Sequence, residues 1–249
     1  MEGVMTKLAI ITDIHGNYAA LKAVLDDIDR QGDIEHIYCL GDLVGIGHET
    51  NEVLACLSER NDVSYVMGNH DEAILRIAEG KEPGSSGEER EHHEWIASHL
   101  DPSFVPFLAQ MPKKREAEYD GKKLLFVHYH LDHHQNFLPI DRHPSVEKLD
   151  EQYRYSHYDV VCFGHHHPLH HFRSDKRLYV NPGSLGCNTK PFAPYAVLHI
   201  DKAIQVTFRQ VPYDPHHFLL AFEEKNVPAR EFILQVFFGN QHLEKGQTS

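Results

Sequence analysis

The sequence predicts an α/β fold built around parallel β-strands. Over about the first seventy residues, short apolar runs alternate with longer segments of helical periodicity, and the links between them are short. Strands that are joined through helices pair in parallel by right-handed crossovers. At 249 residues, the chain is also long enough to bury one substantial core.

Three apolar runs predict buried strands, and the two segments between them predict amphipathic helices. The strands are expected at residues 7–13, 35–42 and 62–69, and the helices at 17–31 and 48–60. In the first helix, Leu21, Val24 and Leu25 recur on one face. Function in such sheets gathers at the carboxyl ends of the strands.

The middle of the chain interrupts this alternation. We expect a helical cap insertion at about residues 71–111, broken by a mobile surface loop in the Gly/Ser/Glu-rich stretch 80–93. The acidic run from residue 87 onward is typical of a solvated helix start. A hairpin at 115–128, turning at the Asp120-Gly121 pair, then begins a second set of strands.

The last part of the chain returns to strands and ends in a helical tail. A helix is expected at 144–155, strands at 159–165, 177–183, 195–200 and 204–211, and two tail helices with an apolar face at about 215–249. We therefore expect residues 1–249 to form a single domain with a cap and a tail.

The charge balance excludes some classes of partner. Lys and Arg number 24 against 37 Asp and Glu, a formal charge of −13. Proteins that bind nucleic-acid polymers need a local cationic surplus, so such a partner is not expected. A small anionic substrate remains compatible, because bound cations can reverse the field inside a cleft.

Location is inferred from what the sequence lacks. Four scattered cysteines without a CxxC pair are typical of reduced thiols. No signal-peptide pattern and no apolar run of about 20 residues is present. We expect a soluble cytoplasmic protein without a membrane partner.

Polar side chains follow many of the expected strands. They are Asp13 and His15 after the first strand, Asp42 after the second, Asn69, His70 and Asp71 after the third, His128 at the end of the hairpin, and His165, His166 and His167 further on. Residues two apart in a strand point to the same side. Asp13 and His15 are therefore expected to reach one centre, as are His165 and His167, with His166 facing elsewhere.

These donors are typical of a two-ion site. Carboxylate, amide and imidazole groups without thiolates suit Mn²⁺, Fe or Zn²⁺. So many donors exceed what one ion that also keeps a water can bind, and they fit two divalent ions about 3.5–4 Å apart with a shared carboxylate. Asp42, flanked by glycines, is the expected bridge.

The motifs DxH, GDxxG, GNHD, a strand-end His and GHxH, in this order, resemble those of the calcineurin-like metallophosphoesterase superfamily. DIHGN and NPGS resemble its small bacterial and archaeal phosphodiesterase branch. The resemblance spans about residues 7–186. It implies a four-layer αββα sandwich of two mixed β-sheets flanked by helices.

The resemblance also implies residue roles. One ion would be held by Asp13, His15, Asp42 and His167, and the other by Asp42, Asn69, His128 and His165. His70 would be catalytic, contacting the phosphate and assisting the leaving oxygen. Two divalent ions, Mn, Fe or Zn, are the implied cofactors.

Several polar residues have two interpretations. Asn17 either contacts the substrate phosphate or caps the following helix. His130 shares a face with His128 and is a candidate for lining the substrate pocket. Asp71 either caps its helix or orients a neighbouring imidazole. His170 and His171 are expected on the surface.

The expected function is a dinuclear metal-dependent phosphoesterase that hydrolyses phosphodiester or phosphoanhydride bonds of a nucleotide-type substrate by metal-activated hydroxide. The segment GDLVGIGH carries no arginine, and arginine forks suit phosphate monoesters. The cap would also enclose a nucleotide-sized ligand. A serine/threonine-type protein phosphatase is the alternative enzyme, and a non-catalytic binding scaffold is the alternative class.

Overall fold

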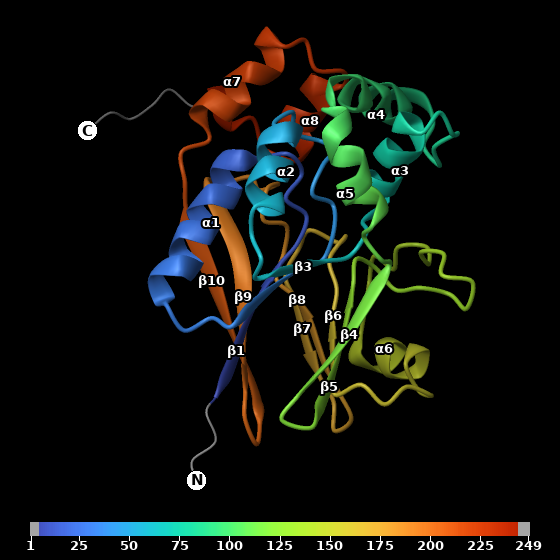
Figure 1. Ribbon diagram of the computed structural model, residues 1–249, viewed down its shortest axis with the longest axis vertical. Helices are drawn as coiled ribbons and strands as arrows, with labels where there is room; N and C mark the ends of the chain where they lie inside the picture. Colours follow the sequence, from blue (N-terminus) through green and yellow to red (C-terminus); the bar gives the residue numbers. More distant parts are fainter. Residues whose placement is uncertain (1–4, 244–249) are drawn as a thin grey trace.

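The computed structural model describes residues 5–243. The first strands of the chain lie in a mixed five-stranded sheet (Figure 1). Its strands are β1 (Thr6–Ile11), β2 (His36–Cys39), β3 (Val63–Tyr65), β9 (Phe192–Ile200) and β10 (Ile204–Pro212). The order is β10-β9-β1-β2-β3. β1, β2 and β3 pair in parallel, as the strand–helix alternation predicts, while β9 and β10 add an antiparallel edge.

A second five-stranded sheet completes the strands of the described chain. It contains β4 (Lys114–Tyr119), β5 (Lys122–Val127), β6 (Val160–Cys162), β7 (His170–Arg173) and β8 (Leu178–Asn181), in the order β4-β5-β6-β8-β7. The β4–β5 hairpin turns at Asp120 and Gly121, both of which have positive φ, as a tight two-residue turn requires. β7 was not expected. His170 and His171, predicted as simple surface residues, lie in this antiparallel edge strand.

The two sheets pack against each other through alternate residues of their strands. Leu8 and Ile10 of β1 lie in the same apolar cluster as Leu124 and Phe126 of β5. The residues between them point to the opposite face of the first sheet, where Ile11 packs among helical side chains. This two-sided burial explains the unbroken apolar run of β1, and the αββα sandwich is confirmed.

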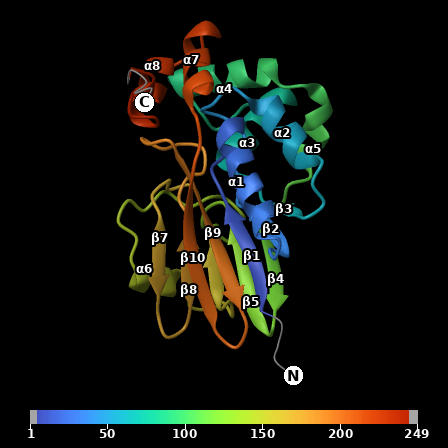
Figure 2. The same cartoon turned by 90° about the vertical axis from the view of Figure 1, so that its left-hand side faces the viewer.

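Eight α-helices cover the outer faces and one end of the described molecule (Figure 2). They are α1 (Tyr18–Gln31), α2 (Thr50–Ser58), α3 (Asn69–Ala78), α4 (Gly87–His99), α5 (Val105–Ala109), α6 (Val146–Gln152), α7 (His216–Glu224) and α8 (Arg230–Val236), with 3₁₀ turns at Pro102–Phe104 and Gln241–Leu243. α1 buries Leu21, Val24 and Leu25 against the first sheet, as its periodicity predicts. α6 covers the second sheet through Leu149.

The expected cap consists of α3, α4 and α5, which lie between β3 and β4 in the chain. The stretch expected as a loop from residue 80 to 93 is non-helical only as far as Ser86, because α4 begins at Gly87. Glu88 and Glu89 occupy its first turn, where carboxylates favour the helix dipole. The interpretation of this acidic run as a helix start is confirmed.

The tail helices α7 and α8 fold back over the same end of the molecule as the cap (Figures 1 and 2). Phe218, Phe222 and Phe238 form an apolar cluster there with Ile46 from the loop after β2. We propose that cap and tail belong to the same domain as the sheets. Residues 1–4 and 244–249 of the expected domain lie outside the described part. Among the residues described, no helix combines the length and apolar character needed to cross a membrane.

Replacing Phe222 tests whether the tail folds together with the sheets. Its side chain is fully buried, so Phe222→Ala is expected to lower the free energy of unfolding by about 3–5 kcal/mol. Chemical denaturation should still show one cooperative transition. Leu220→Ala, at an exposed position of the same helix, is the control and should cost about 0.5 kcal/mol or less. A separate early transition in the Phe222 variant would show that the tail is an independent unit.

Candidate metal centre

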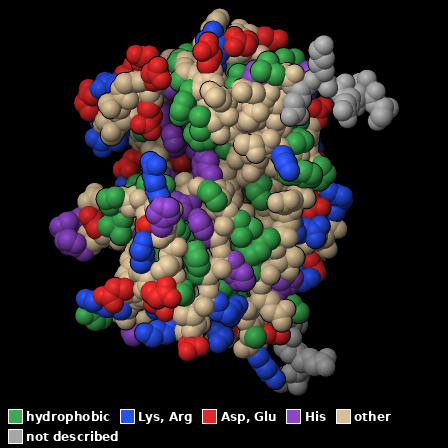
Figure 3. All heavy atoms as spheres, turned by 180° about the vertical axis from the view of Figure 1, so that it is seen from behind, with side chains coloured by type: hydrophobic (Ala, Val, Ile, Leu, Met, Phe, Trp, Pro, Cys, Tyr) green, Lys and Arg blue, Asp and Glu red, His purple; other side chains and the backbone are tan. Residues whose placement is uncertain are grey.

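The predicted donor residues meet at one end of the two sheets, in the loops that follow the strands. Figure 3 shows His side chains gathered across the middle of one face, between the sheets and the helical end. The explanation by strand alternation is wrong, since β1 ends at Ile11 and β6 at Cys162. The donors are turned inward by positive φ angles at Asp13 (54°), His15 (50°), Asp42 (51°), His165 (67°) and His167 (65°).

Such backbone conformations are uncommon for residues other than glycine and are retained where the surroundings enforce them. Here the loops hold one another. The amide of His15 donates to the Asp42 carbonyl over 2.9 Å, and the amide of Asp13 donates to the Gly41 carbonyl over 3.0 Å. From the second sheet, the Ser184 hydroxyl donates to the Asp13 carbonyl over 2.8 Å. Strained backbone in several linked loops is a feature of functional sites.

The first group of donors surrounds His15 Nε2. This atom lies 3.0 Å from His167 Nε2, 3.7 Å from Asp13 Oδ1 and 3.8 Å from Asp42 Oδ2. His167 Nε2 is also 3.6 Å from Asp13 Oδ1. These are the four side chains that the family resemblance implies for the first ion.

The second group surrounds His128 Nε2 in the same way. It lies 2.9 Å from Asn69 Oδ1, 3.2 Å from His165 Nδ1 and 3.2 Å from Asp42 Oδ2. Ligand atoms that are each about 2.1 Å from one ion lie about 3.0–3.4 Å apart, so this spacing suits a common cation. All seven predicted metal residues are therefore brought together, with Asp42 shared between the groups.

The electrostatics of this pair of groups favour positive charge. Burial opposes ionisation of Asp42, but His128 and His70 outweigh it and hold the pKa of the carboxyl well below its ordinary range. Burial likewise opposes protonation of His128, yet the adjacent Asp42 raises its pKa to about 9. Burial lowers the pKa of His165 and of His167 to about 4, so their rings are neutral at pH 7 and have lone pairs for a cation.

Supporting contacts orient the donors. His128 Nδ1 donates to the Leu40 carbonyl over 2.8 Å, which directs Nε2 into the centre. The interpretation of Asp71 as a cap is confirmed, since its carboxylate accepts from the Gly68 amide before α3. It also accepts from the amide of Asp42 over 2.8 Å and thereby fixes the loop that carries the shared carboxylate. A side chain at Gly68 would collide with that carboxylate.

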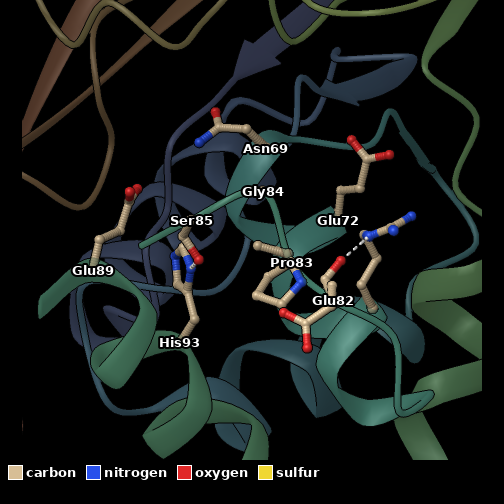
Figure 4. Close-up of a pocket in the computed structure, with 10 residues that line it drawn as sticks. Asn69, Glu72, Glu82, Pro83, Gly84, Ser85, Glu89 and His93 are labelled. Atoms are coloured by element: carbon tan, nitrogen blue, oxygen red, sulfur yellow. Dashed lines mark hydrogen bonds between the residues drawn. The ribbon is translucent and has the colours of Figure 1, made fainter. Parts of the chain in front are cut away.

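His70 borders the centre without joining either group of four. Its amide donates to Asp42 Oδ1 over 2.9 Å, and its Nδ1 shares a hydrogen bond of 2.7 Å with His93 Nε2. His93 Nδ1 in turn lies 2.9 Å from the Ser85 hydroxyl. Figure 4 shows His93 and Glu89 of α4 on one side of a cavity of about 410 Å³, across from Asn69.

Two residues of this region were missed from the sequence. His93 belongs to none of the motifs. Cys187 is one of the four scattered cysteines, to which the sequence assigns no function, but its sulfur lies within 4.8 Å of a ring nitrogen of His15 and of one of His167. Burial raises the pKa of the Cys187 thiol well above its ordinary value.

The two residues proposed for substrate binding lie apart from the donors. Asn17 Oδ1 accepts from the Ala20 amide and caps α1, while its Nδ2 donates to the Gly186 carbonyl. The N-cap interpretation thus accounts for its side chain. His130 is buried behind the second sheet, where Nδ1 and the Tyr153 hydroxyl share a hydrogen bond of 2.9 Å.

The sandwich of two sheets and the paired carboxylate–imidazole groups at its end define a metallophosphoesterase. A family model described as the calcineurin-like phosphoesterase superfamily domain matches residues 6–203. The chain belongs to this superfamily and is a hydrolase. Members depend on divalent metals, and the described residues contain the candidate clusters needed to hold them.

Individual relatives agree with this assignment. An uncharacterized protein of Methanocaldococcus jannaschii is 32% identical over 200 residues, which cover 74% of this chain and 77% of that protein. A symmetrical bis(5'-nucleosyl)-tetraphosphatase of Paracidovorax citrulli is 33% identical over 126 residues, 49% of this chain and 43% of that protein. The chain thus spans less than half the length of that tetraphosphatase.

Solved structures confirm the fold. A hypothetical protein from Pyrococcus horikoshii OT3 superposes with a TM-score of 0.77 at 18% identity, over 94% of this chain and 98% of that one. A metallophosphoesterase from Sphaerobacter thermophilus gives a TM-score of 0.72 at 21% identity, with the same coverage of both chains.

The buried position of His130 predicts a pH dependence of stability. Burial lowers its pKa from 6.5 to about 3 in the folded protein. Between these values, the unfolded chain takes up a proton that the folded chain does not, so stability falls as the pH drops from 6.5 to 3. His130→Gln should reduce the loss between pH 6.5 and 4.5 by about 2–3 kcal/mol in denaturant titrations. The exposed His133→Gln is the control, and identical losses in both variants would contradict the assignment.

Proposed function

We propose that this protein is a dinuclear metal-dependent phosphoesterase that acts on phosphodiester or phosphoanhydride bonds of a small nucleotide-type substrate. One observation carries the proposal. The buried carboxylate of Asp42 faces two separate sets of donors, with Oδ2 at 3.8 Å from His15 Nε2 and 3.2 Å from His128 Nε2. A shared carboxylate between two donor sets is the arrangement that a pair of ions requires.

The donor set fits divalent Mn, Fe or Zn. The proposed ligands of one ion are Asp13, His15, Asp42 and His167, and those of the other are Asp42, Asn69, His128 and His165. Two such ions would neutralise charge on the phosphoryl oxygens and supply a hydroxide nucleophile at neutral pH. The protein contributes the fixed positions of these side chains and the buried surroundings that strengthen their electrostatics.

His70 is the proposed catalytic residue beside the ions. Its backbone amide donates to Asp42, and its ring lies beside that of His15, with 5.2 Å between the centroids. The hydrogen bond that Nδ1 shares with His93 fixes the orientation of the ring. The remaining ring nitrogen is then available to contact the phosphate and to assist the leaving oxygen, which is a general-acid role.

Two observations support a nucleotide-type substrate. The tetraphosphatase of Paracidovorax citrulli, similar to part of this chain, is named for a dinucleoside substrate. The helical cap and tail leave cavities beside Asn69 and His70 of a size suited to a small molecule.

An activity screen tests this proposal. With Mn²⁺ added, the protein should hydrolyse bis-p-nitrophenyl phosphate and should prefer nucleotide esters or anhydrides over phosphopeptides. Inertness with Mn²⁺, Fe²⁺ and Zn²⁺ would favour a binding scaffold. A clear preference for phosphopeptides would favour a serine/threonine-type protein phosphatase.

Two substitutions separate the roles of metal binding and catalysis. Asp42→Asn removes the shared carboxylate charge, so elemental analysis should find both ions depleted and activity lost. His70→Ala should retain both ions and lower kcat by about 10²–10⁴-fold, the contribution typical of a general acid. Circular dichroism controls for folding. A His70→Ala variant emptied of both ions would overturn this division of roles.

A further inference from the structure

A second cavity, of about 260 Å³, lies between the cap and the tail. Helices α4 and α8 stand side by side there (Figures 1 and 2), and His92 Nδ1 donates to the Pro228 carbonyl over 3.2 Å. The cavity lining includes Ile46, Phe232, Ile233 and Phe237. It is therefore mainly apolar and aromatic.

This cavity adjoins the candidate metal centre. His70, the proposed catalytic residue, is itself part of the lining. The Phe237 ring lies 5.5 Å from the ring of His167, measured between centroids. A group attached to the oxygen that His70 assists can thus extend directly into the cavity.

The lining favours a flat, apolar ring system. Phe232 lines the cavity and is 55% exposed, so its ring is accessible to a ligand. Aromatic side chains stack on nucleobases of any sequence because every base has a π-face. The volume is just below the range of about 300–1,000 Å³ found for larger ligands, so it suits one base rather than a dinucleotide.

The charges around the cavity disfavour an anionic occupant. Its ionisable lining residues are three histidines together with Glu88 and Glu89, and no Lys or Arg is among them. In the neighbouring cavity of Figure 4, Glu72 and Glu82 are already paired with Lys113 and Arg90. A diphosphate or nucleotide that departs into the apolar cavity would meet Glu88 and Glu89 there, without the arginine or lysine partners that such groups require.

We propose that this cavity receives an uncharged nucleoside as the leaving group, and that the hydrolysed bond is the ester between a phosphate and a nucleoside hydroxyl. The inference rests on the proposed function and narrows it from diesters and anhydrides to nucleoside phosphodiesters. In the reaction, a water oxygen bonds to phosphorus and the bond from phosphorus to the nucleoside oxygen breaks. A proton from the consumed water ends on that oxygen, and the nucleoside leaves as a neutral alcohol.

Phe232→Ala tests the cavity, and Val236→Ala is the matched control at an exposed position of the same helix outside the lining. Adenosine binding is measured by calorimetry, and kcat/KM is measured on the dinucleoside monophosphate ApA with Mn²⁺. Loss of one base–aromatic stack should weaken both by about 5- to 150-fold in Phe232→Ala. Val236→Ala should match the unaltered protein.

The choice between substrates is the second part of the test. ApA should be hydrolysed faster than diadenosine tetraphosphate. Adenosine binding that is equal in the two variants, or a preference for the tetraphosphate, would overturn the inference. Absence of any phosphoesterase activity would refute the proposed function and the leaving-group role together. The adenosine titration, which needs no turnover, would still show whether the cavity binds a base.

Discussion

The buried carboxylate of Asp42 is the constraint on which this end of the molecule depends. A buried charge requires polar partners to replace the water that it has lost. For Asp42 these partners are the imidazoles of both donor groups and the amide of His70, which donates to Oδ1. A second buried carboxyl, Asp71, holds the Asp42 backbone, and burial together with repulsion from Asp42 raises the pKa of Asp71 to about 7. Divalent cations bound by the proposed donor groups would offset the negative charge concentrated here.

The arrangement of the two sheets in the sandwich brings the partners of Asp42 together. Parallel strands of both sheets end at the same place, so donors from distant parts of the chain become neighbours. Several donor residues have positive φ angles, a backbone conformation that is uncommon for residues other than glycine. Hydrogen bonds between the loops of the two sheets offset the strain of this conformation. The asparagine of the NPGS motif is an example: Asn181 Nδ2 donates to the Gly164 carbonyl over 2.9 Å, beneath the histidines that follow.

Cap and tail flank the centre, and among their residues only Asn69, at the start of α3, is a proposed donor. Through His93, α4 contacts His70, and through Phe232 and Phe237 the tail forms an apolar wall. The net charge of −13 is no obstacle to an anionic substrate, since divalent ions bound at the centre would reverse the field there. Outside the centre, the cavity between cap and tail is lined by Glu88 and Glu89 and by no Lys or Arg.

The sequence by itself predicted the parallel strand–helix alternation, helices such as α1 and the β4–β5 turn, and the family resemblance of its motifs implied the sandwich and the seven proposed donors. Periodicity, turn chemistry and motif order are properties of the sequence itself, so they can be recognised before the fold is known. It did not reveal β7, the contact of His93 with His70 or the position of Cys187, and it left open whether Asn17 caps a helix or contacts the substrate. Only the tertiary structure decided these, because each depends on which distant segments become neighbours and on how deeply they are buried. The tertiary structure also decided the positive φ angles at Asp13 and His165, since the surrounding loops enforce a backbone conformation that these residues do not themselves prefer.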